Sequence, residues 1–115
     1  MTQAALSHVA YLVLTAVVDG PKHGYAILDD VRTVSGGSVV LHTGTLYAIL
    51  ERLHGGGLIE VDREEVVASR LRRYYRITGA GVTRLTVETE RMTQAARTAS
   101  RRLAAVTPHA AGGAA

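Results

Sequence analysis

Apolar residues recur at helical spacing in the first half of the chain. Two amphipathic stretches, residues 4–18 and about 22–33, predict two helices separated by the break Asp19-Gly20-Pro21. A third, shorter stretch predicts a helix that ends at the three glycines 55–57. His42 or Thr43 is expected to cap this helix, and Thr43 is favoured because histidine caps poorly. The apolar stripe of the third helix consists of Leu46, Ile49, Leu50 and Leu53.

Alternating apolar and polar positions follow the third helix. Residues 58–62 and 71–77 have the period of two that is typical of half-buried strands, and residues 63–70 connect them as a wing. Three helices followed by a two-stranded wing is the order of a winged helix-turn-helix domain, predicted here over residues 1–77. The strand residues expected to face the core are Ile59, Val61, Leu71, Tyr75 and Ile77.

A long last helix is predicted from Thr78, a good N-cap, to about Val106. Apolar or small residues recur there in unbroken steps of three and four, which is a heptad pattern. A helix of this length extends beyond one small domain, so a second copy of the chain is its expected partner. Pro108 is expected to end it, and residues 107–115 are predicted to be a disordered tail. The predicted seam of this dimerisation helix, residues 78–106, consists of Val82, Leu85, Thr89, Met92, Ala96, Ala99, Leu103 and Val106.

The predicted fold class is therefore mainly α with a small β wing. Its 115 residues contain no cysteine, which excludes a disulfide framework and a thiol sensor. The apolar run Val9–Val18 is too short to span a bilayer and no basic residue precedes it, so we expect a cytoplasmic protein with no membrane contact. Residues 1–69 hold four Lys/Arg and eight Asp/Glu, whereas residues 70–115 hold nine Arg and two Glu. This basic second part favours contacts with nucleic-acid phosphates, while the arginines nearest the C-terminus are expected to form a solvated helix face.

Three sequence motifs lie in order along the chain. The first is Pro21-Lys22-His23-Gly24-Tyr25-Ala26-Ile27, and the second is Gly44-Thr45-Leu46-Tyr47, followed by Leu50, Arg52-Leu53 and Gly57-Leu58-Ile59. The third is Arg72-Arg73-Tyr74-Tyr75-Arg76-Ile77-Thr78, with Gly81 after it. Together they resemble the PadR family of bacterial winged-helix transcriptional regulators. The resemblance implies a homodimer that binds a twofold-symmetric operator in double-stranded DNA, and a repressor that an effector releases.

The third helix and the wing supply candidate DNA contacts. Small and hydroxyl-bearing residues at the start of the helix suit an approach to bases or phosphates, and arginines on the second strand suit phosphates or a minor groove. The structural alternatives are capping, packing and a solvated strand face. The wing begins with Glu64-Glu65, where family wings often carry a Gly-Arg-Pro or similar turn, which implies less contact at its tip. The predicted DNA-binding residues are Lys22, His42, Thr43, Gly44, Thr45, Tyr47, Ala48, Arg70, Arg72 and Arg73.

The resemblance also implies a small-molecule site. Compact PadR-like proteins bind planar aromatic or drug-like effectors between the last helices and the first helix. The chain has no Trp and no Phe to supply the usual aromatic residue, so the predicted effector-binding residues are Tyr11, Thr89, Met92 and Ala96. No cofactor and no metal are expected, because the five histidines lack ligand spacing and cysteine is absent. No nucleophile–base pair is recognisable, so an enzyme is not expected.

Two other classes of function stay open at this point. One is a winged helix that contacts other proteins, for which the acidic start of the wing is the indication. The other is a ligand-binding protein with no role in regulation. Salt-sensitive binding to a symmetric DNA site distinguishes both from a transcriptional regulator.

Overall fold

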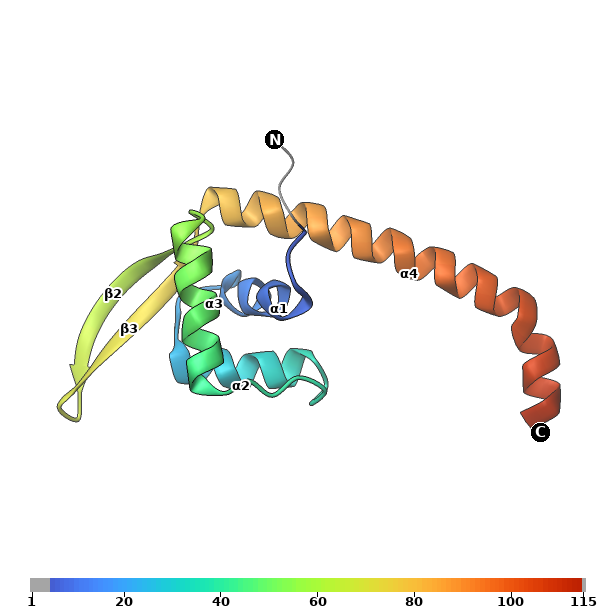
Figure 1. Ribbon diagram of the computed structural model, residues 1–115, viewed down its shortest axis with the longest axis horizontal. Helices are drawn as coiled ribbons and strands as arrows, with labels where there is room; N and C mark the ends of the chain where they lie inside the picture. Colours follow the sequence, from blue (N-terminus) through green and yellow to red (C-terminus); the bar gives the residue numbers. More distant parts are fainter. Residues whose placement is uncertain (1–4, 115) are drawn as a thin grey trace. The chain divides into compact units, whose positions relative to one another are not determined.

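The computed structural model describes the chain from residue 5 to residue 114, and its side chains as far as residue 106. The elements follow in the order α1 (His8–Val17), β1 (Lys22–His23), α2 (Gly24–Val34), α3 (Thr43–Gly55), β2 (Ile59–Val67), β3 (Arg70–Ile77) and α4 (Gly79–Ala114) (Figure 1). The strands form an antiparallel sheet in the order β1-β3-β2. Three helices followed by a hairpin and a long helix confirm the predicted fold class. The chain divides into two compact units, Met1–Leu85 and Thr86–Ala115, which are described separately.

The core of the first unit is made where α1, α2 and α3 pack together. The predicted stripe of α3 is buried, with Leu46 and Leu50 essentially inaccessible to solvent. Leu14 of α1 and Ile27 of α2 are buried against the same cluster. Because each helix buries one face of its 3.6-residue period, the opposite face of α3 is left at the surface.

The structure adds a strand that the sequence analysis placed in a helix. Lys22 and His23 form β1, which pairs with Tyr75 and Tyr74 of β3, so α2 begins at Gly24. A two-residue strand carries no periodicity, which explains why the sequence did not indicate it. The first helix likewise begins later than predicted, at His8, because the Ser7 hydroxyl accepts a hydrogen bond from the Ala10 N–H at 3.1 Å and caps it.

The hairpin β2–β3 is longer than predicted, and most of the expected wing is strand. A two-residue turn joins the strands at Ala68 and Ser69, whose φ angles of 51° and 65° are left-handed. The hairpin extends past the helices in Figure 1, so its outer half has no core to face. Leu71, which was expected in the core, is therefore 62% exposed. Val61, also expected in the core, is 37% exposed although it lies nearer the base of the hairpin, opposite Tyr75.

The start of α4 is fixed to the first unit by Thr78 and Gly81. Thr78 is the predicted cap, and its hydroxyl accepts the Gly81 N–H at 3.0 Å and donates to the Gly57 carbonyl at 2.6 Å. A Cβ at Gly81 would overlap the Leu58 carbonyl oxygen and lie 2.6 Å from Ile77 Cγ1. This position therefore requires glycine for close packing of the helix against the start of the hairpin.

The helix α4 continues past Pro108 to Ala114, so the predicted end near Val106 is wrong. Proline removes one helical hydrogen bond, but the helix continues through it. The sequence predicted disorder for residues 107–115. The side chains of these residues, and the whole of Ala115, lie outside the described residues. None of the helices in the described part of the chain is long and apolar enough to cross a membrane.

The predicted dimerisation seam is divided between the two units. Leu85 is 8% exposed and belongs to the core of its own chain. The larger seam residues farther along α4 are exposed in the single chain, with Met92 at 42%, and Leu103 and Val106 at 60% each. Leu85 is thus a core residue, whereas Met92, Leu103 and Val106 are exposed apolar side chains in the single chain.

Candidate nucleic-acid interface

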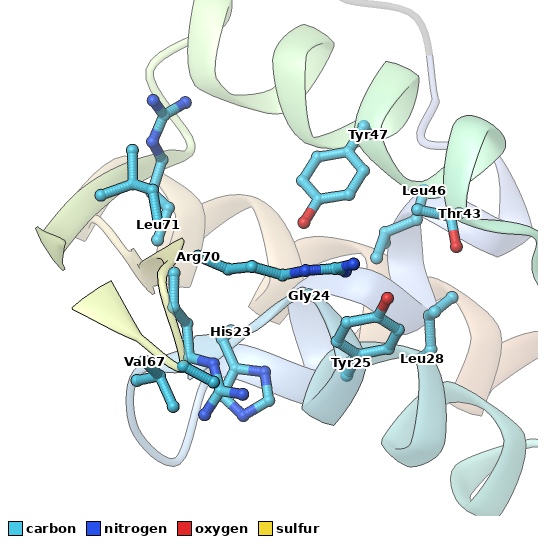
Figure 2. A pocket seen from close by; sticks show the side chains of 13 residues that line it. His23, Gly24, Tyr25, Leu28, Thr43, Leu46, Tyr47, Val67, Arg70 and Leu71 are labelled. Carbon is cyan, nitrogen blue, oxygen red and sulfur yellow. The ribbon is translucent and has the colours of Figure 1, made fainter. Parts of the chain in front are cut away.

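A hollow of about 420 Å³ lies between the N-terminal ends of α2 and α3 and the turn end of the hairpin (Figure 2). We call it the α2–α3–wing hollow. It exists because β1 covers β3 only at Tyr74 and Tyr75, so the outer edge of β3 nearer the turn faces open space. His23, Tyr25, Thr43, Tyr47, Arg70 and Arg72 are the polar side chains that line it, together with Arg73.

The outward face of α3 carries the residues predicted to meet DNA. Thr43, Gly44, Thr45, Tyr47 and Ala48 are all exposed, as is His42 before them, because the buried stripe lies on the opposite side. A Cβ at Gly44 would meet nothing within 4 Å, so the backbone there is open to a partner. The side chains brought together at one helix end are thus those that the sequence placed there.

The N-terminus of α3 differs from the other helix starts. Ser7, His23 and Thr78 each cap a helix with a side-chain hydrogen bond. His42 occupies the cap position of α3 and makes no such bond, so the prediction that Thr43 caps is wrong: Thr43 is already the first helical residue. Within the described part of the chain, no side chain accepts from the first turn of α3. Its N–H groups are available to an outside acceptor such as a phosphate oxygen.

Tyr47 and Tyr25 stand on opposite sides of the hollow. Tyr47 is 46% exposed and packs over α2, since a Cβ at Gly24 would lie 2.7 Å from its hydroxyl oxygen. Tyr25 is 64% exposed, although it is one of the apolar or aromatic residues of α2 that could have packed in the core. It lies two positions before the buried Ile27, and a two-residue step turns a helix by about 200°. This offset was the sequence signal that could have placed Tyr25 at the surface.

Ion pairs divide the arginines of the hairpin into two groups. Arg73 Nε lies 2.9 Å from Glu64 Oε2, and Arg76 binds Glu60 at 3.2 Å. The Glu64 carboxylate raises the pKa of Arg73 above its ordinary value. Arg70 and Arg72 have no acidic partner within residues 5–106, and Figure 2 shows Arg70 pointing into the hollow toward Tyr47 and Tyr25. These two guanidinium groups are the ones left to bind an anion.

The acidic start of the wing is neutralised within the hairpin. Glu64 pairs with Arg73, and Glu65 accepts a hydrogen bond from the Tyr74 hydroxyl at 2.6 Å. The Arg63 guanidinium carbon lies 3.8 Å from the centre of the Tyr74 ring, and Arg63 Nε is 3.8 Å from Glu65. The two glutamates therefore do not form an unpaired acidic patch.

Lys22 and His23 have structural partners near the hollow. Lys22 binds the Asp19 carboxylate at 2.6 Å and the Ala16 carbonyl, and it does not line the hollow. His23 Nδ1 accepts the Ala26 N–H at 3.4 Å, and its ring meets Tyr74 edge-on. Burial, and then the positive charge of Arg72, lower the pKa of His23 below its ordinary value, because both disfavour a charged imidazole.

The predicted effector residues belong to different units. Tyr11 is partly buried against the core of the first unit, whereas Thr89, Met92 and Ala96 are exposed on α4 in the second unit. The effector site stays a prediction. Among the residues that the structure describes, no group of three or more His, Asp or Glu side chains is placed to hold a metal ion.

Comparison with known proteins gives consistent matches. Residues 13–87 match the transcriptional regulator PadR-like family. An uncharacterized protein from Lysinibacillus sphaericus is 30% identical over 74 residues, covering 64% of this chain and 68% of the relative. A PadR-like transcriptional regulator from Bacillus cereus has a TM-score of 0.69 at 21% identity, over 83% of this chain and 90% of that chain. Bacillus subtilis PadR, solved in complex with operator DNA, has a TM-score of 0.62 at 21% identity, over 70% of this chain and 45% of that chain.

Proposed function

Because the chain belongs to the PadR-like family of transcriptional regulators, we propose that it is a homodimeric repressor that binds a twofold-symmetric DNA operator and that a small effector releases. Regulators of this family act by binding rather than by catalysis. The observation that carries the DNA-binding proposal is the pairing of the uncapped α3 N-terminus with two arginines that lack acidic partners. Backbone N–H groups and guanidinium groups are both donors that phosphates accept.

Each protomer then offers one recognition helix to a major groove. Thr43, Thr45 and Tyr47 lie at the end of α3 that reaches the bases in helix-turn-helix proteins. Arg70 and Arg72 hold the sugar–phosphate backbone beside it. Bacillus subtilis PadR, which has the same fold, was solved in complex with operator DNA, and this supports DNA binding by the chain.

The exposed seam of α4 supports the dimer. Met92, Leu103 and Val106 are apolar, lie at heptad spacing and are 42% to 60% exposed in the single chain. Two such seams packed together set the distance between two recognition helices. A planar aromatic or drug-like effector held by Tyr11, Thr89, Met92 and Ala96 would change the crossing of the helices and so release the DNA.

The alternative of a protein-binding winged helix rested on the acidic start of the wing. Glu64 and Glu65 are paired inside the hairpin, so this alternative has no feature in its favour among the described side chains. A ligand-binding protein without regulation is separated from a repressor only by DNA binding itself.

Salt-dependent binding tests the proposal. A symmetric duplex is first selected from random-sequence DNA with the purified protein, and affinity is then measured by fluorescence anisotropy at several salt concentrations. Each lost phosphate contact lowers the slope of log K against log salt by about 0.9. Removing Arg70 and Arg72 from both protomers deletes four contacts, so the slope should fall by about 3.6.

The matched control is the double variant Arg73→Ala/Arg76→Ala, which removes the same charge from the same strand. Those arginines are held by Glu64 and Glu60, so the slope should change much less. A slope near zero for the unaltered protein, or an unchanged slope for Arg70→Ala/Arg72→Ala, contradicts the DNA-binding proposal.

A further inference from the structure

We propose that Tyr74 is a positioning residue for DNA binding: its hydroxyl holds the Glu65 carboxylate away from Arg72 and so keeps the Arg72 guanidinium available to a phosphate. The effect on DNA rests on the proposed function. The competition between Tyr74 and Arg72 for Glu65 does not rest on it, and it can be tested in the free protein.

Two neighbouring pairs on the hairpin have the same register but differ in ion pairing. Glu64 lies opposite Arg73, and Arg73 Nε is 2.9 Å from Glu64 Oε2. Glu65 lies opposite Arg72 in the same way, where opposed side chains share one face of the sheet with Cβ atoms about 5 Å apart. Arg72 nevertheless has no acidic partner among the side chains of residues 5–106. Something other than the register therefore keeps Glu65 from Arg72.

The Glu65 carboxylate is held by Tyr74 and Arg63 instead. Tyr74 lies two residues from Arg72 on β3, so its side chain is on the same face and diagonal to Glu65. Its hydroxyl donates to Glu65 Oε1 at 2.6 Å, which is the length of a charge-assisted bond. Arg63 Nε is 3.8 Å from Glu65 Oε2, which is too long for a hydrogen bond. The hydroxyl is thus the group that orients the carboxylate.

The Tyr74 ring is fixed by both neighbouring strands. His23 of β1 and Arg63 of β2 lie opposite Tyr74 in the register. The His23 ring meets the tyrosine ring edge-on, with 5.3 Å between the centroids, and the Arg63 guanidinium carbon lies 3.8 Å from the ring centre. Both contacts involve the ring and not the hydroxyl. Tyr74→Phe should therefore keep the packing and remove only the hydrogen bond to Glu65.

Loss of the hydroxyl should transfer Glu65 to Arg72. The carboxylate then lacks its short hydrogen bond, and the nearest cation directly across the strand pair is Arg72. Arg72 lines the α2–α3–wing hollow beside the first turn of α3, where it is assigned to a phosphate. A guanidinium group paired with a carboxylate has no net charge left for that phosphate.

Salt-dependent DNA binding tests the consequence. Tyr74→Phe should lower the magnitude of the salt slope by about 1.8, because one phosphate contact is lost on each protomer. Adding Glu65→Gln should restore the slope, since the amide cannot neutralise Arg72, whereas Glu65→Gln alone should leave it unchanged. In an Arg72→Ala protein, Tyr74→Phe should lower the slope no further. The matched control is Glu64→Gln, on the opposite face of β2, which should not restore the slope of Tyr74→Phe.

NMR of the free protein tests the competition without DNA. In Tyr74→Phe, the Arg72 Nε–Hε signal should shift as the ion pair forms, and adding Glu65→Gln should return it. In the unaltered protein, Glu65→Gln should leave this signal in place.

Three outcomes overturn the proposal. One is an Arg72 signal that is the same in Tyr74→Phe as in the unaltered protein. Another is a reduced slope that Glu65→Gln does not restore, which shows that Tyr74 contacts DNA itself. The third is a Tyr74→Phe protein that melts early and does not respond to Glu65→Gln, which shows a structural tyrosine. Absence of DNA binding by the unaltered protein refutes the proposed function instead, and the Arg72 signal still decides the competition for Glu65.

Discussion

Replacing Leu103 with Glu should separate the proposed dimer while leaving each protomer folded. Leu103 is 60% exposed in the single chain, and burying a whole leucine side chain is worth about 1.5–3 kcal/mol. Covering the exposed part therefore gives about 1–2 kcal/mol per protomer and about 2–4 kcal/mol for the symmetric pair. Since about 1.4 kcal/mol is a tenfold change, the dimer Kd should rise about thirtyfold to several hundredfold, and more once a buried carboxylate is included.

Sedimentation velocity over a range of protein concentrations measures this Kd, and circular-dichroism melts check the fold. Gln94→Glu puts the same charge on an exposed position of α4 outside the seam and should leave the Kd unchanged. Leu85→Ala should behave in the opposite way, because Leu85 is 8% exposed in its own core: it should cost about 2–5 kcal/mol of unfolding free energy. A Leu103→Glu protein that dimerises as tightly as the unaltered chain would refute the seam as the interface.

Three other predictions concern the first unit. Gly81→Ala should lower the melting temperature by several degrees, because its Cβ overlaps a backbone carbonyl oxygen, whereas Gly79→Ala, with nothing within 4 Å, should not; equal melts would contradict the packing argument. The pKa of His23 lies below its ordinary value of 6.5, so the folded state binds this proton less readily than the unfolded state. In thermal melts the stability should therefore fall as the pH drops below about 6.5, and His23→Asn, which keeps a cap acceptor, should flatten that dependence. Tyr47→Phe should weaken selected and scrambled DNA to similar extents, while Thr45→Val should weaken selected DNA more; if both variants melt early and affinity follows only the folded fraction, the two residues are structural.

The local elements follow from the sequence alone. Leu46, Ile49, Leu50 and Leu53 recur at the helical period, so the buried and outward faces of α3 could be predicted before the structure. Thr78 has the side chain that caps a helix, and the structure uses it in that role. These predictions are reliable because capping and amphipathic periodicity involve residues within one or two turns of each other.

Burial at particular positions could not be predicted in the same way. Leu85 and Leu103 both lie on the seam of one heptad pattern, yet one is in the core of its own chain and the other is exposed. Leu71 alternates correctly with polar neighbours, but the hairpin has extended beyond the helices where it lies. Periodicity shows which residues share a face, and only the tertiary structure shows whether anything covers that face.

The pairing of charges on the hairpin also depends on the tertiary structure and not on the sequence pattern alone. The sequence predicted Glu64, Glu65 and Arg70 in the wing and Arg72 and Arg73 on the second strand, but the register decided which of them meet. A bulge between Val61 and Arg63 shifts the register, so that Glu64 lies opposite Arg73. Had the register at the base of the strands continued, Glu64 would lie opposite Arg72. The sequence supplied the charges, and the bulge decided that Glu64 lies opposite Arg73 and Glu65 opposite Arg72. Strand register depends on contacts along the whole hairpin, so it could not be predicted from the period of the strands.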